Sequence, residues 1–570
     1  MTFLGNIHSS FRRPVHLAAA SLLLSFALFA TRSLPAAAQR FEKTVERNAW
    51  NMTSNVCGVR ADSVSISQAQ LYGRYTDGGF RDLSAPERLW NVGAFAQTIS
   101  HFGKVSMTGK FAFDNEEAYK ACGSMFSRPG AYPVDLFEFT PGRKTRQSYT
   151  VDGGIAARLS PLLTIGGKVE FLSSNYSKRK DLRYTDYLLD MKVTPSLLFS
   201  FGERVRLGLS YSYRRVAESL SAEELGISDQ SYYAFLNKGL MYGSYDVWTG
   251  GASHLKEAGV SGFPVRENFH GLALQLSAGE FIAELSGSLG GGKAGEKDVR
   301  WFQFRENGLG LLLGWTRDVH RVTLKASAKA ESGSEDIIEK VTENGVTTTI
   351  NYGTRNIYGS ALWTLNPEYV FLGTNLYARA GAKFDWSDEV SRMVYPYSAK
   401  TGVFTAGLYA SATYSIRGFD IGAGVSFLGG KWNDSLTNQD GSVPVSQAPK
   451  RLDELDVQGK WFAAAMEYAT ANRLRLEGSL RYNFRSEQTP RSPEASTSAL
   501  SPAVTAQMRL SRLVISFETA LFEDEAFVCR HLPYCVNDKN IKHNEFKEDS
   551  YICGGSAPFF CIFCPAAGRA

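Results

Sequence analysis

The feature that most constrains this chain is a long series of segments in which apolar side chains alternate with small or polar ones. About eighteen such segments, each of roughly ten residues, come in pairs joined by turns of about two to five residues. In the clearest one, residues 105–114 read V-S-M-T-G-K-F-A-F-D. A β-strand places the two sets on opposite faces, so one face suits lipid and the other water. A soluble β-sandwich rarely keeps one strand length over so many strands, so the pattern indicates a membrane barrel.

The start of the chain predicts export. A basic pair at 12–13 is followed by an apolar run at 17–30 and by three alanines at 36–38. This order is typical of a secretory signal peptide, and the run is too short to span a bilayer. We predict that residues 1–38 are the signal peptide and that the mature chain begins at Gln39.

Charge and hydropathy limit the partners and the fold. Removal of the three arginines among residues 1–38 lowers the formal net charge from +5 to +2, which gives no reason to expect nucleic acid as a partner. No apolar run long enough for a membrane helix follows. An exported chain that crosses lipid with strands must close its sheet, because open edges cannot be satisfied in hydrocarbon. We therefore predict an all-β fold: a single antiparallel transmembrane β-barrel of about 18–20 strands in the bacterial outer membrane.

Turn signals divide the barrel into two ends. Short turns are predicted at 101–103, 160–161, 202–203, 278–279, 317–318, 366–367, 417–418, 471–472 and 511–512. Longer polar connections are predicted at 115–146, 174–186, 216–267, 291–305, 331–354, 385–402, 430–459 and 485–501. Short turns are typical of the periplasmic end and long loops of the extracellular end. Residues 39–67 are then a short periplasmic N-terminal segment, far too short for the folded plug of a TonB-dependent receptor, and residues 68–522 are the barrel.

The last part of the chain departs from this pattern. A final descending strand is expected after residues 513–521, but alternation stops at 523 and residues 523–570 are rich in cysteine. The cysteines are Cys529, Cys535, Cys553, Cys561 and Cys564. One interpretation is a disulfide-bonded or zinc-binding appendage, since histidines also occur there. The spacings of these cysteines and histidines fit no standard zinc motif. This favours a second interpretation, in which out-of-frame or truncated coding sequence stands in place of the native last strand. We predict no metal site and no cofactor.

Charged residues on the inward phase are the candidates for the lumen wall. The basic ones are Lys104, Lys110, Lys168, Arg206, Arg321, Lys325, Lys329, Arg475 and Arg481, and the acidic ones are Glu170, Glu284 and Glu477. Facing lipid, such charges would cost about 2–4 kcal/mol at the midplane. The basic excess predicts a modest anion preference if the lumen is open; alternatively the charges pair and fill a closed interior. A barrel of this size is too wide for side chains alone, so a closed one needs another filler.

The longest connection, 216–267, is the predicted filler. Its aromatic residues are Tyr232, Tyr233, Phe235, Tyr242, Tyr245 and Trp248. They either pack inward as a constriction or face outward to bind a partner.

One histidine raises the question of an enzyme. His270 shares the phase of Leu272, Leu274 and Leu276, which puts it on the lipid side near the outer interface. An interfacial lipid hydrolase is therefore a third alternative, but no serine partner is identifiable from spacing. We predict that the protein is not an enzyme.

The signal peptide, the hairpin series and the run D-G-G-F-R-D at Asp77 to Asp82 together resemble the uncharacterised outer-membrane barrel proteins of Bacteroidota. The resemblance implies a barrel and its location, and it supplies no activity or site residues. We predict a passive or accessory, porin-like solute pathway. Its expected partners are outer-membrane lipid, the barrel-assembly machinery and small solutes. The alternative is a non-conducting surface or structural barrel whose long loops bind partners.

Overall fold

The computed structural model describes residues 41–62, 64–78, 81, 84–180, 182–202, 204–223, 232–248, 263–295, 301–416, 419–449, 458–482, 499–509 and 512–522. Its strands are β1 Ile66–Gly78, β2 Arg88–Phe102, β3 Val105–Ser124, β4 Asp135–Arg158, β5 Leu163–Lys178, β6 Arg183–Phe201, β7 Val205–Glu223, β8 Tyr232–Asn237, β9 Gly243–Trp248, β10 Phe263–Ala278, β11 Phe281–Ala294, β12 Trp301–Arg317, β13 His320–Glu343, β14 Val346–Leu372, β15 Leu376–Arg392, β16 Tyr397–Ile416, β17 Phe419–Asn438, β18 Arg473–Tyr482, β19 Ala499–Arg509 and β20 Arg512–Phe522. Its helices are α2 Phe41–Arg47, the 3-10 turns η1 Ala49–Met52, η2 Val56–Ala61 and η3 Val445–Gln447, and α3 Gln458–Thr470.

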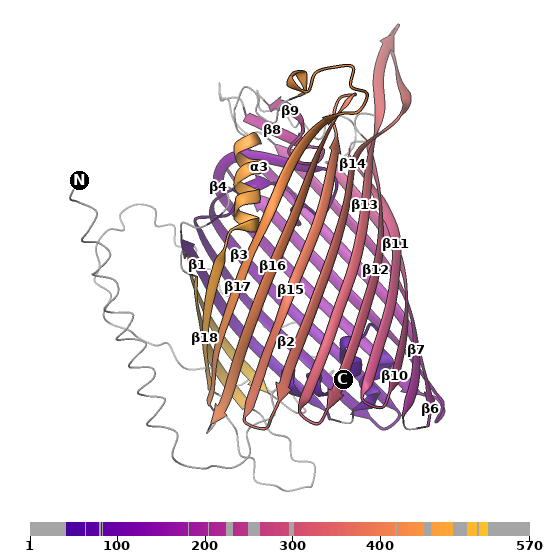
Figure 1. Cartoon of the computed structure of the whole chain (residues 1–570), viewed down its shortest axis with the longest axis vertical. Coiled ribbons are helices and arrows are strands. Elements are labelled where there is room, and N and C mark those ends of the chain that lie inside the picture. The colour runs from indigo at the N-terminus through magenta and orange to yellow at the C-terminus, as the bar shows by residue number, and fades with distance from the viewer. Residues whose placement is uncertain are drawn as a thin grey trace, which may run out of the picture. The chain divides into compact units, whose positions relative to one another are not determined.

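Strand pairing runs around a ring (Figure 1). Each strand from β1 to β6 pairs with the next, β7 pairs with β10, and the order continues from β10 to β20. The last strand then pairs with the first, from Ala69 opposite Leu521 to Gly78 opposite Arg512. All these pairs are antiparallel, and the 20 strands less β8 and β9 leave eighteen in the ring. The predicted single antiparallel transmembrane β-barrel is confirmed.

The two faces of the ring differ as lipid and water require. Along β10, Leu272, Leu274 and Leu276 are 53%, 51% and 47% exposed, whereas Ala273 and Gln275 between them are 6% and 1% exposed. An exposed apolar stripe on every second residue is the surface that hydrocarbon accepts. The alternation read from the sequence therefore sorts apolar side chains outward and polar ones inward.

The short connections gather at one end of the ring, which we name the short-turn end. They are 103–104, 159–162, 202–204, 279–280, 318–319 and 373–375. The opposite, long-loop end carries 125–134, the β8–β9 hairpin and the helix α3 (Figure 1). The first five predicted turns lie within two residues of the observed ones, and the predicted turn 417–418 lies outside the described residues.

The predicted turn at Asn366 and Pro367 is wrong. Both residues lie inside β14, and the pairing of β14 with β15 steps from Leu365 to Glu368 across them. Proline has no backbone N–H to give to the ladder. The side-chain amide of Asn366 donates instead to the carbonyl of Ala382, at 2.7 Å. The sequence signal marked an irregularity within a strand.

The predicted connection 331–354 is also wrong, because β13 and β14 run through it as one long hairpin. Only Asn344 and Gly345 lie between the two strands, and both have positive φ, at 51° and 80°. Asn-Gly suits a two-residue turn that needs positive φ at both positions. This hairpin stands farthest out at the long-loop end (Figure 1).

The strand expected before the predicted turn 471–472 is a helix, and this changes the topology. The sequence of α3, QGKWFAAAMEYAT, is rich in alanine and other helix formers. With a helix there, β18 descends toward the short-turn end, so 471–472 and 511–512 belong to the long-loop end. The descending strand that the prediction lacked is β20 itself. The ring is complete within the described strands, and the cysteine-rich residues 523–570 lie outside the described part.

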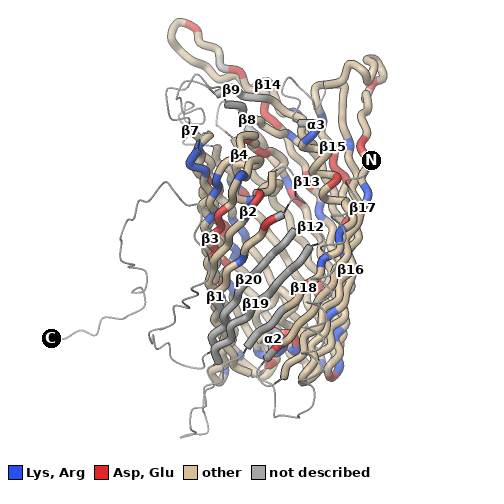
Figure 2. Tube along the Cα trace, turned by 90° about the vertical axis from the view of Figure 1, so that its left-hand side faces the viewer, with Lys and Arg blue, Asp and Glu red and all other residues tan. Residues whose placement is uncertain are grey.

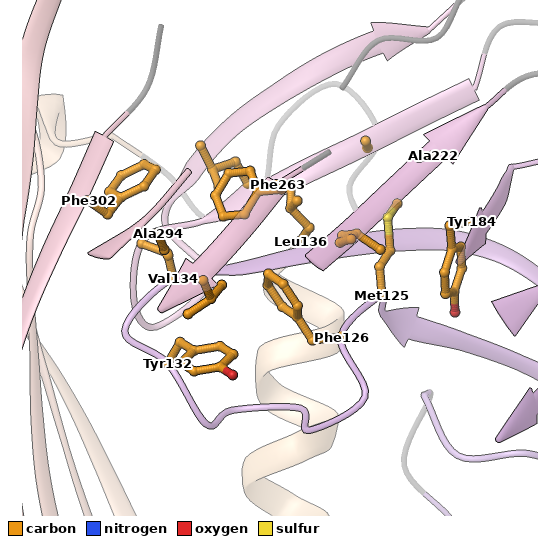
Figure 3. Close-up of a cluster of buried hydrophobic side chains, with 14 of the residues drawn as sticks. Met125, Phe126, Tyr132, Val134, Leu136, Tyr184, Ala222, Phe263, Ala294 and Phe302 are labelled. Atoms are coloured by element: carbon orange, nitrogen blue, oxygen red, sulfur yellow. The ribbon is translucent and has the colours of Figure 1, made fainter. Parts of the chain in front are cut away.

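Buried apolar side chains concentrate at the long-loop end. One cluster joins residues 125–134 to the ends of the neighbouring strands, with Phe126, Val134, Leu136 and Phe263 at its centre (Figure 3). We name residues 125–134, the β8–β9 hairpin and α3 together the cap.

In the described part of the chain, no helix is long and apolar enough to cross a membrane.

Because β20 pairs with β1 along ten residues of each strand, the ring does not need residues 526–570. We expect a chain that ends at Glu525 to fold into a barrel with the same heat-modifiable gel mobility as the full chain. Loss of the compact, heat-sensitive band in the shortened chain would contradict this strand order.

Candidate functional site: a lumen occupied at both ends

Residues 41–62, which we name the plug, lie inside the ring at the short-turn end (Figure 1). The turn η2 contacts β3, β4, β5 and β6. On the other side, the ammonium of Lys43 donates to the carbonyls of Gly373 and Thr374 between β14 and β15. A segment that touches strands so far apart around the ring must cross its interior.

One side of the plug is held by charge. The carboxylate of Glu46 pairs with the guanidinium groups of Arg321 and Arg379 and accepts a hydrogen bond of 2.8 Å from the hydroxyl of Tyr377. The Arg321 side chain is 3% exposed and also lies 3.9 Å from Glu368. Removing one partner of a buried ion pair costs about 3–5 kcal/mol, because the other charge is left buried. Glu46 is therefore a strong anchor of the plug.

The other side is held by hydrogen bonds. The backbone N–H and the hydroxyl of Ser54 both donate to the carboxylate of Glu284, each at 2.8 Å. The Asn55 amide donates to the carbonyl of Leu197 at 2.8 Å and to Gln275 at 3.1 Å, and Gln275 donates to Glu284 at 2.9 Å. Each such bond contributes about 0.5–1.5 kcal/mol net, more where a charge takes part.

Local sequence explains the compact form of the plug. The side chains of Asn48 and Asn55 accept from the N–H groups of Trp50 and Cys57, at 3.1 and 3.0 Å, and so cap the two 3-10 turns. Trp50 and Cys57 then pack against Ile282 of the wall. The plug is thus a small folded unit with its own apolar contacts.

Cys57 has the lowest exposed fraction in the plug and is fully buried. Its thiol donates to the carbonyl of Ser196 at 3.4 Å, and burial raises its pKa to about 12. The wall makes room with glycine: a Cβ at Gly166 would lie 2.8 Å from Val56 and 3.0 Å from the Cys57 sulfur. The plug and this part of the wall are fitted to each other.

Beyond the plug the wall carries ion pairs that stay in contact with solvent. Lys168 and Lys192 share Glu170, at 2.7 and 3.4 Å, and Lys329 lies 2.7 Å from Glu306. These five side chains are 23–39% exposed. Ion pairs in water contribute about 0–1 kcal/mol each, so they tolerate a hydrated interior without locking it. Acidic and basic positions are spread along the wall strands (Figure 2).

At the long-loop end, residues 125–134 are bound by carboxylates from the strands. The N–H of Ser127 donates to Asp186 and Glu218, at 2.8 and 3.0 Å, and the hydroxyl of Tyr132 donates to Glu218. Burial and the Glu218 carboxylate raise the pKa of Tyr132. The phenol therefore keeps its proton and remains a donor.

A second set of contacts adds charge and ring packing. Arg128 lies 3.3 Å from Asp190 and 3.7 Å from Glu267. The rings of Phe126 and Phe263 meet at 6.0 Å (Figure 3). This part of the cap thus makes ionic, hydrogen-bonded and apolar contacts at once.

The rest of the cap joins the β8–β9 hairpin to α3. The hairpin pairs with β4. On α3, the ring of Trp461 lies 6.2 Å from that of Phe137 and 5.2 Å from that of Phe139. The ring therefore holds folded polypeptide at both ends, with solvated charges between.

The predicted charged residues fall into groups. Those with an ion-pair partner on the wall are Lys110, Lys168, Glu170, Lys329, Arg475 and Glu477. Arg321 and Glu284 bind the plug. Lys104 lies in the turn 103–104, Arg206 is half-buried in β7 and Lys325 is exposed in β13, while the side chain of Arg481 lies outside the described part.

The predicted aromatic filler is found only in part. Phe235 is fully buried in the cap, and Tyr242 packs against the same apolar cluster. Tyr232, Tyr233, Tyr245 and Trp248 lie in β8 and β9, but their side chains are outside the described part. Both described residues pack in the apolar cluster of the cap.

His270 lies where the sequence placed it, on the exposed face of β10. Its Nδ1 is 2.7 Å from the hydroxyl of Tyr211, and its ring lies 5.3 Å from that of Tyr213. Neither tyrosine is the serine or the carboxylate that a hydrolase triad places beside its histidine. These contacts fit a histidine in an aromatic interface. Separately, in the described part of the chain no group of three or more His, Cys, Asp and Glu residues could hold a metal ion.

Sequence reasoning does not place the plug inside the barrel, because residues 39–67 lack strand alternation and predict only a short periplasmic segment. Two signals were available. Asn48 and Asn55 each precede a short turn, and Trp50 and Cys57 are apolar residues with no partner in a strand pattern. Neither signal reveals that the partner is the barrel interior.

The burial of Cys57 gives a direct test of how the plug is seated. Because the thiol is buried and its pKa is raised, alkylation of Cys57 at pH 8 should be at least tenfold slower in the folded barrel than after heat denaturation. Replacing Asn55→Ala removes the cap of η2 and two bonds to the wall and should speed alkylation. Peptide mass spectrometry reads Cys57 separately from the other cysteines, and equal rates in folded and denatured protein would contradict the seated plug.

A family of unknown function (DUF6850) matches residues 58–512 of the chain. No curated protein matches the chain. Among solved structures, the FrpB iron transporter from Neisseria meningitidis (F5-1 variant) is similar, with 10% identity, 82% of this chain and 84% of that chain covered and a TM-score of 0.39. The outer membrane transporter YddB from Escherichia coli is similar at 8% identity, with 80% of each chain covered and a TM-score of 0.35.

Proposed function

Since this chain belongs to the family of unknown function DUF6850, we propose from its own geometry that it is an outer-membrane channel for small polar solutes that rests closed. The plug closes the periplasmic end, the cap closes the extracellular end, and solute passes when both give way. This refines the porin-like pathway expected from the sequence by adding a gate at each end.

The observation that supports a channel is the contrast between the ends and the middle of the lumen. Arg321, which holds the plug, is 3% exposed, whereas the paired Lys168 and Lys192 between the ends are 32% and 37% exposed. A purely structural barrel has no need of solvated charges in its interior. A chamber that admits polar solute does, because charged walls stay hydrated.

The outer-membrane location is part of this proposal. It is supported by the predicted signal peptide, which lies outside the described residues, and by the apolar outer face of an antiparallel barrel. The short turns are assigned to the periplasm and the long loops to the cell surface. The plug then faces the periplasm.

The contacts of the plug suit a gate. Reversing a closed state that is 99% populated takes about 5.5 kcal/mol of differential binding. Hydrogen bonds at Ser54 and Asn55 and the pairs of Glu46 supply energy of that order. They are few and polar, so water can replace them when the plug leaves.

A surface-binding role is the second candidate, and the β13–β14 hairpin favours it. Beyond its pairing with β12 and β15, the hairpin exposes Val346 and Tyr352, at 66% and 60%. Isolated two-stranded ribbons are marginal in water, so a partner at the cell surface would stabilise this one. A barrel that stays silent after its plug is removed would favour this role.

The channel can be tested by current through planar bilayers. Wild-type protein should be closed most of the time, and deletion of residues 41–62 should give lasting stepwise conductance. Glu284→Ala should raise the open probability about tenfold, because losing the bonds from Ser54 costs about 1.4 kcal/mol or more. The matched control is Glu280→Ala at the turn of the same hairpin, where the side chain is 45% exposed and bonds Trp315; it should leave gating unchanged.

Before any recording, heat-modifiable mobility must show that each variant is a folded barrel. If the folded deletion variant conducts no more than wild type, the plug is not the gate. If Glu284→Ala and Glu280→Ala behave alike, the bonds of Ser54 do not hold it closed.

Ion selectivity tests the charge of the pathway. The basic excess on the inward phase predicts a modest preference for anions. Reversal of Lys325 and Arg475 to Glu in the variant without residues 41–62 should move the reversal potential in a salt gradient toward cations. An unchanged potential would remove these two residues from the conducting wall.

A further inference from the structure

A group of exposed arginines lies on the outward face of β7, β10 and β12, which with β11 follow one another in the wall (Figure 1). The strand register places Arg215 of β7 opposite Asn268 of β10. On the other side of Asn268 lie Gly291 of β11 and then Arg305 of β12. Arg266 is two residues from Asn268, on the same face of β10. We name Arg215, Arg266 and Arg305 the arginine patch. Neighbouring strands are about 4.8 Å apart, so these long side chains can surround one charged group.

The arginine patch lies just beyond the apolar belt of the barrel. Counted from the short-turn end, Arg215 is the eleventh residue of β7, and Arg266 and Arg305 are the thirteenth residues of β10 and β12. About 9–11 residues of a tilted strand cross the hydrocarbon of a bilayer. With the long loops at the cell surface, as in the proposed function, the arginine patch lies at the level of the outer headgroups.

The acids of the same strands do not balance this charge. The acidic side chains described in β7, β10, β11 and β12 are on the inward phase; they are Glu218, Glu267, Glu284 and Glu306. In β13, Asp336 accepts hydrogen bonds from Gln303 at 3.2 Å and from Thr354 at 2.8 Å. Among the described residues, none forms an ion pair with the arginine patch. An anion from the membrane can therefore pair with it.

Two other outward basic residues toward the long-loop end are paired within the protein. Arg143 of β4 pairs with Glu117 of β3, and Lys400 of β16 lies 3.7 Å from Asp388 of β15. There the barrel supplies both halves of each ion pair. At the arginine patch, the described chain supplies the basic half alone.

Two hydrogen-bonded pairs border the arginine patch on the side of the apolar belt. The hydroxyl of Tyr213 donates to the side-chain carbonyl of Asn268 at 2.8 Å, and Nδ1 of His270 is 2.7 Å from the hydroxyl of Tyr211. Such side chains, with an apolar body and a polar tip, suit the boundary between hydrocarbon and headgroups. Because its carbonyl accepts from Tyr213, Asn268 keeps its amide N–H groups as donors beside the arginines.

Next to the arginine patch, the wall leaves a place for an acyl chain. Leu272, Gly287 and Leu309 lie in one register row across β10, β11 and β12. Leu272 and Leu309 are 53% and 66% exposed. Gly287 has no side chain, and within 4 Å a Cβ there would meet only Leu309, at 3.8 Å. We name these three residues the leucine row. It is an apolar surface with a low point at Gly287, along which a lipid chain can pack.

We propose that the arginine patch and the leucine row bind one phosphorylated lipid of the outer leaflet, with its phosphate in the patch and an acyl chain over Gly287. Arginine suits phosphate because its planar guanidinium group donates two parallel hydrogen bonds. The site lies on the outside of the barrel, so it depends neither on the plug nor on conduction. It rests on the proposed function only for the outer-membrane location and the orientation.

The test uses the full folded chain in detergent and native mass spectrometry, which counts bound lipid molecules. The probe is hexa-acylated lipid A with its phosphates, and the reference is the same lipid A after its phosphates have been removed. Wild-type barrel should bind the phosphorylated probe saturably and at least tenfold more tightly than the reference, because each arginine near the headgroup adds attraction for an anionic lipid. Equal binding of the two lipids overturns the proposal.

Two variants locate the site. The first removes the charge of the arginine patch by combining Arg215→Gln, Arg266→Gln and Arg305→Gln. It should weaken the phosphorylated probe at least tenfold and leave the reference unchanged. The second, Gly287→Trp, fills the low point of the leucine row and should weaken both lipids. Unchanged binding of the probe in either variant, with the heat-modifiable band intact, overturns the proposal.

A matched control removes the same charge from exposed basic residues elsewhere on the ring; it combines Arg143→Gln, Lys400→Gln and Lys431→Gln. It should bind the phosphorylated probe as wild type does. An equal loss of binding in this control and in the variant of the arginine patch would mean general attraction between charges, and it overturns the proposal.

Cell fractionation tests the location separately from the lipid site. A barrel recovered outside the outer membrane contradicts the proposed function. A barrel that is recovered in the outer membrane but does not distinguish the two lipids contradicts the lipid site alone.

Discussion

The structure depends on one constraint: every backbone N–H and C=O of a strand in lipid must find its partner in another strand. The pairing of β20 with β1 satisfies it for the eighteen strands of the ring. A ring of that size has an interior wider than its side chains can fill. The barrel therefore needs either water or additional polypeptide inside, and this one has room for both, in different places. The plug and the cap fill two parts of the interior, and solvated ion pairs line the wall between them.

The two closures are built from different chemistry. The plug is held mainly by polar contacts around Glu46, Ser54 and Asn55, with a small apolar contact of Trp50 and Cys57 against Ile282. The cap adds a large apolar cluster around Phe126 and Phe263. Burial of one such side chain contributes about 1.5–3 kcal/mol, so the cap is the harder closure to open. A channel of this design would be regulated first from the side of the plug.

The ring could be predicted from the sequence because the alternation of apolar and polar residues is present in each strand by itself. The prediction failed where one local signal is compatible with two kinds of structure. Pro367 reads as a turn, yet a strand can pass through it when Asn366 supplies a side-chain donor. The alanine run of α3 carries helix propensity, but its position and length also fit the strand expected before 471–472. Asn344-Gly345 is a two-residue hairpin signal, and it lies inside the predicted connection 331–354.

The interior contacts could not be predicted in the same way. Nothing near Glu46 in the chain indicates that its partners are Arg321 and Arg379, since these meet it only through the closed ring. Lys144 and Lys178 likewise read as inward charges, and only the fold shows that they share Glu138. Which polar residues face inward follows from periodicity; which of them meet does not.

The sequence separation of the plug contacts has a consequence for assembly. The plug precedes the strands of the ring along the chain, yet Asn55 bonds a residue 220 positions later and Glu46 one 333 positions later. Contacts so distant in the chain form late, because every intervening strand must first be in place. The first described segment of the polypeptide is therefore among the last to settle, and a seated plug records that β3 to β15 have joined correctly. Seating of the plug is thereby coupled to the joining of β3 to β15.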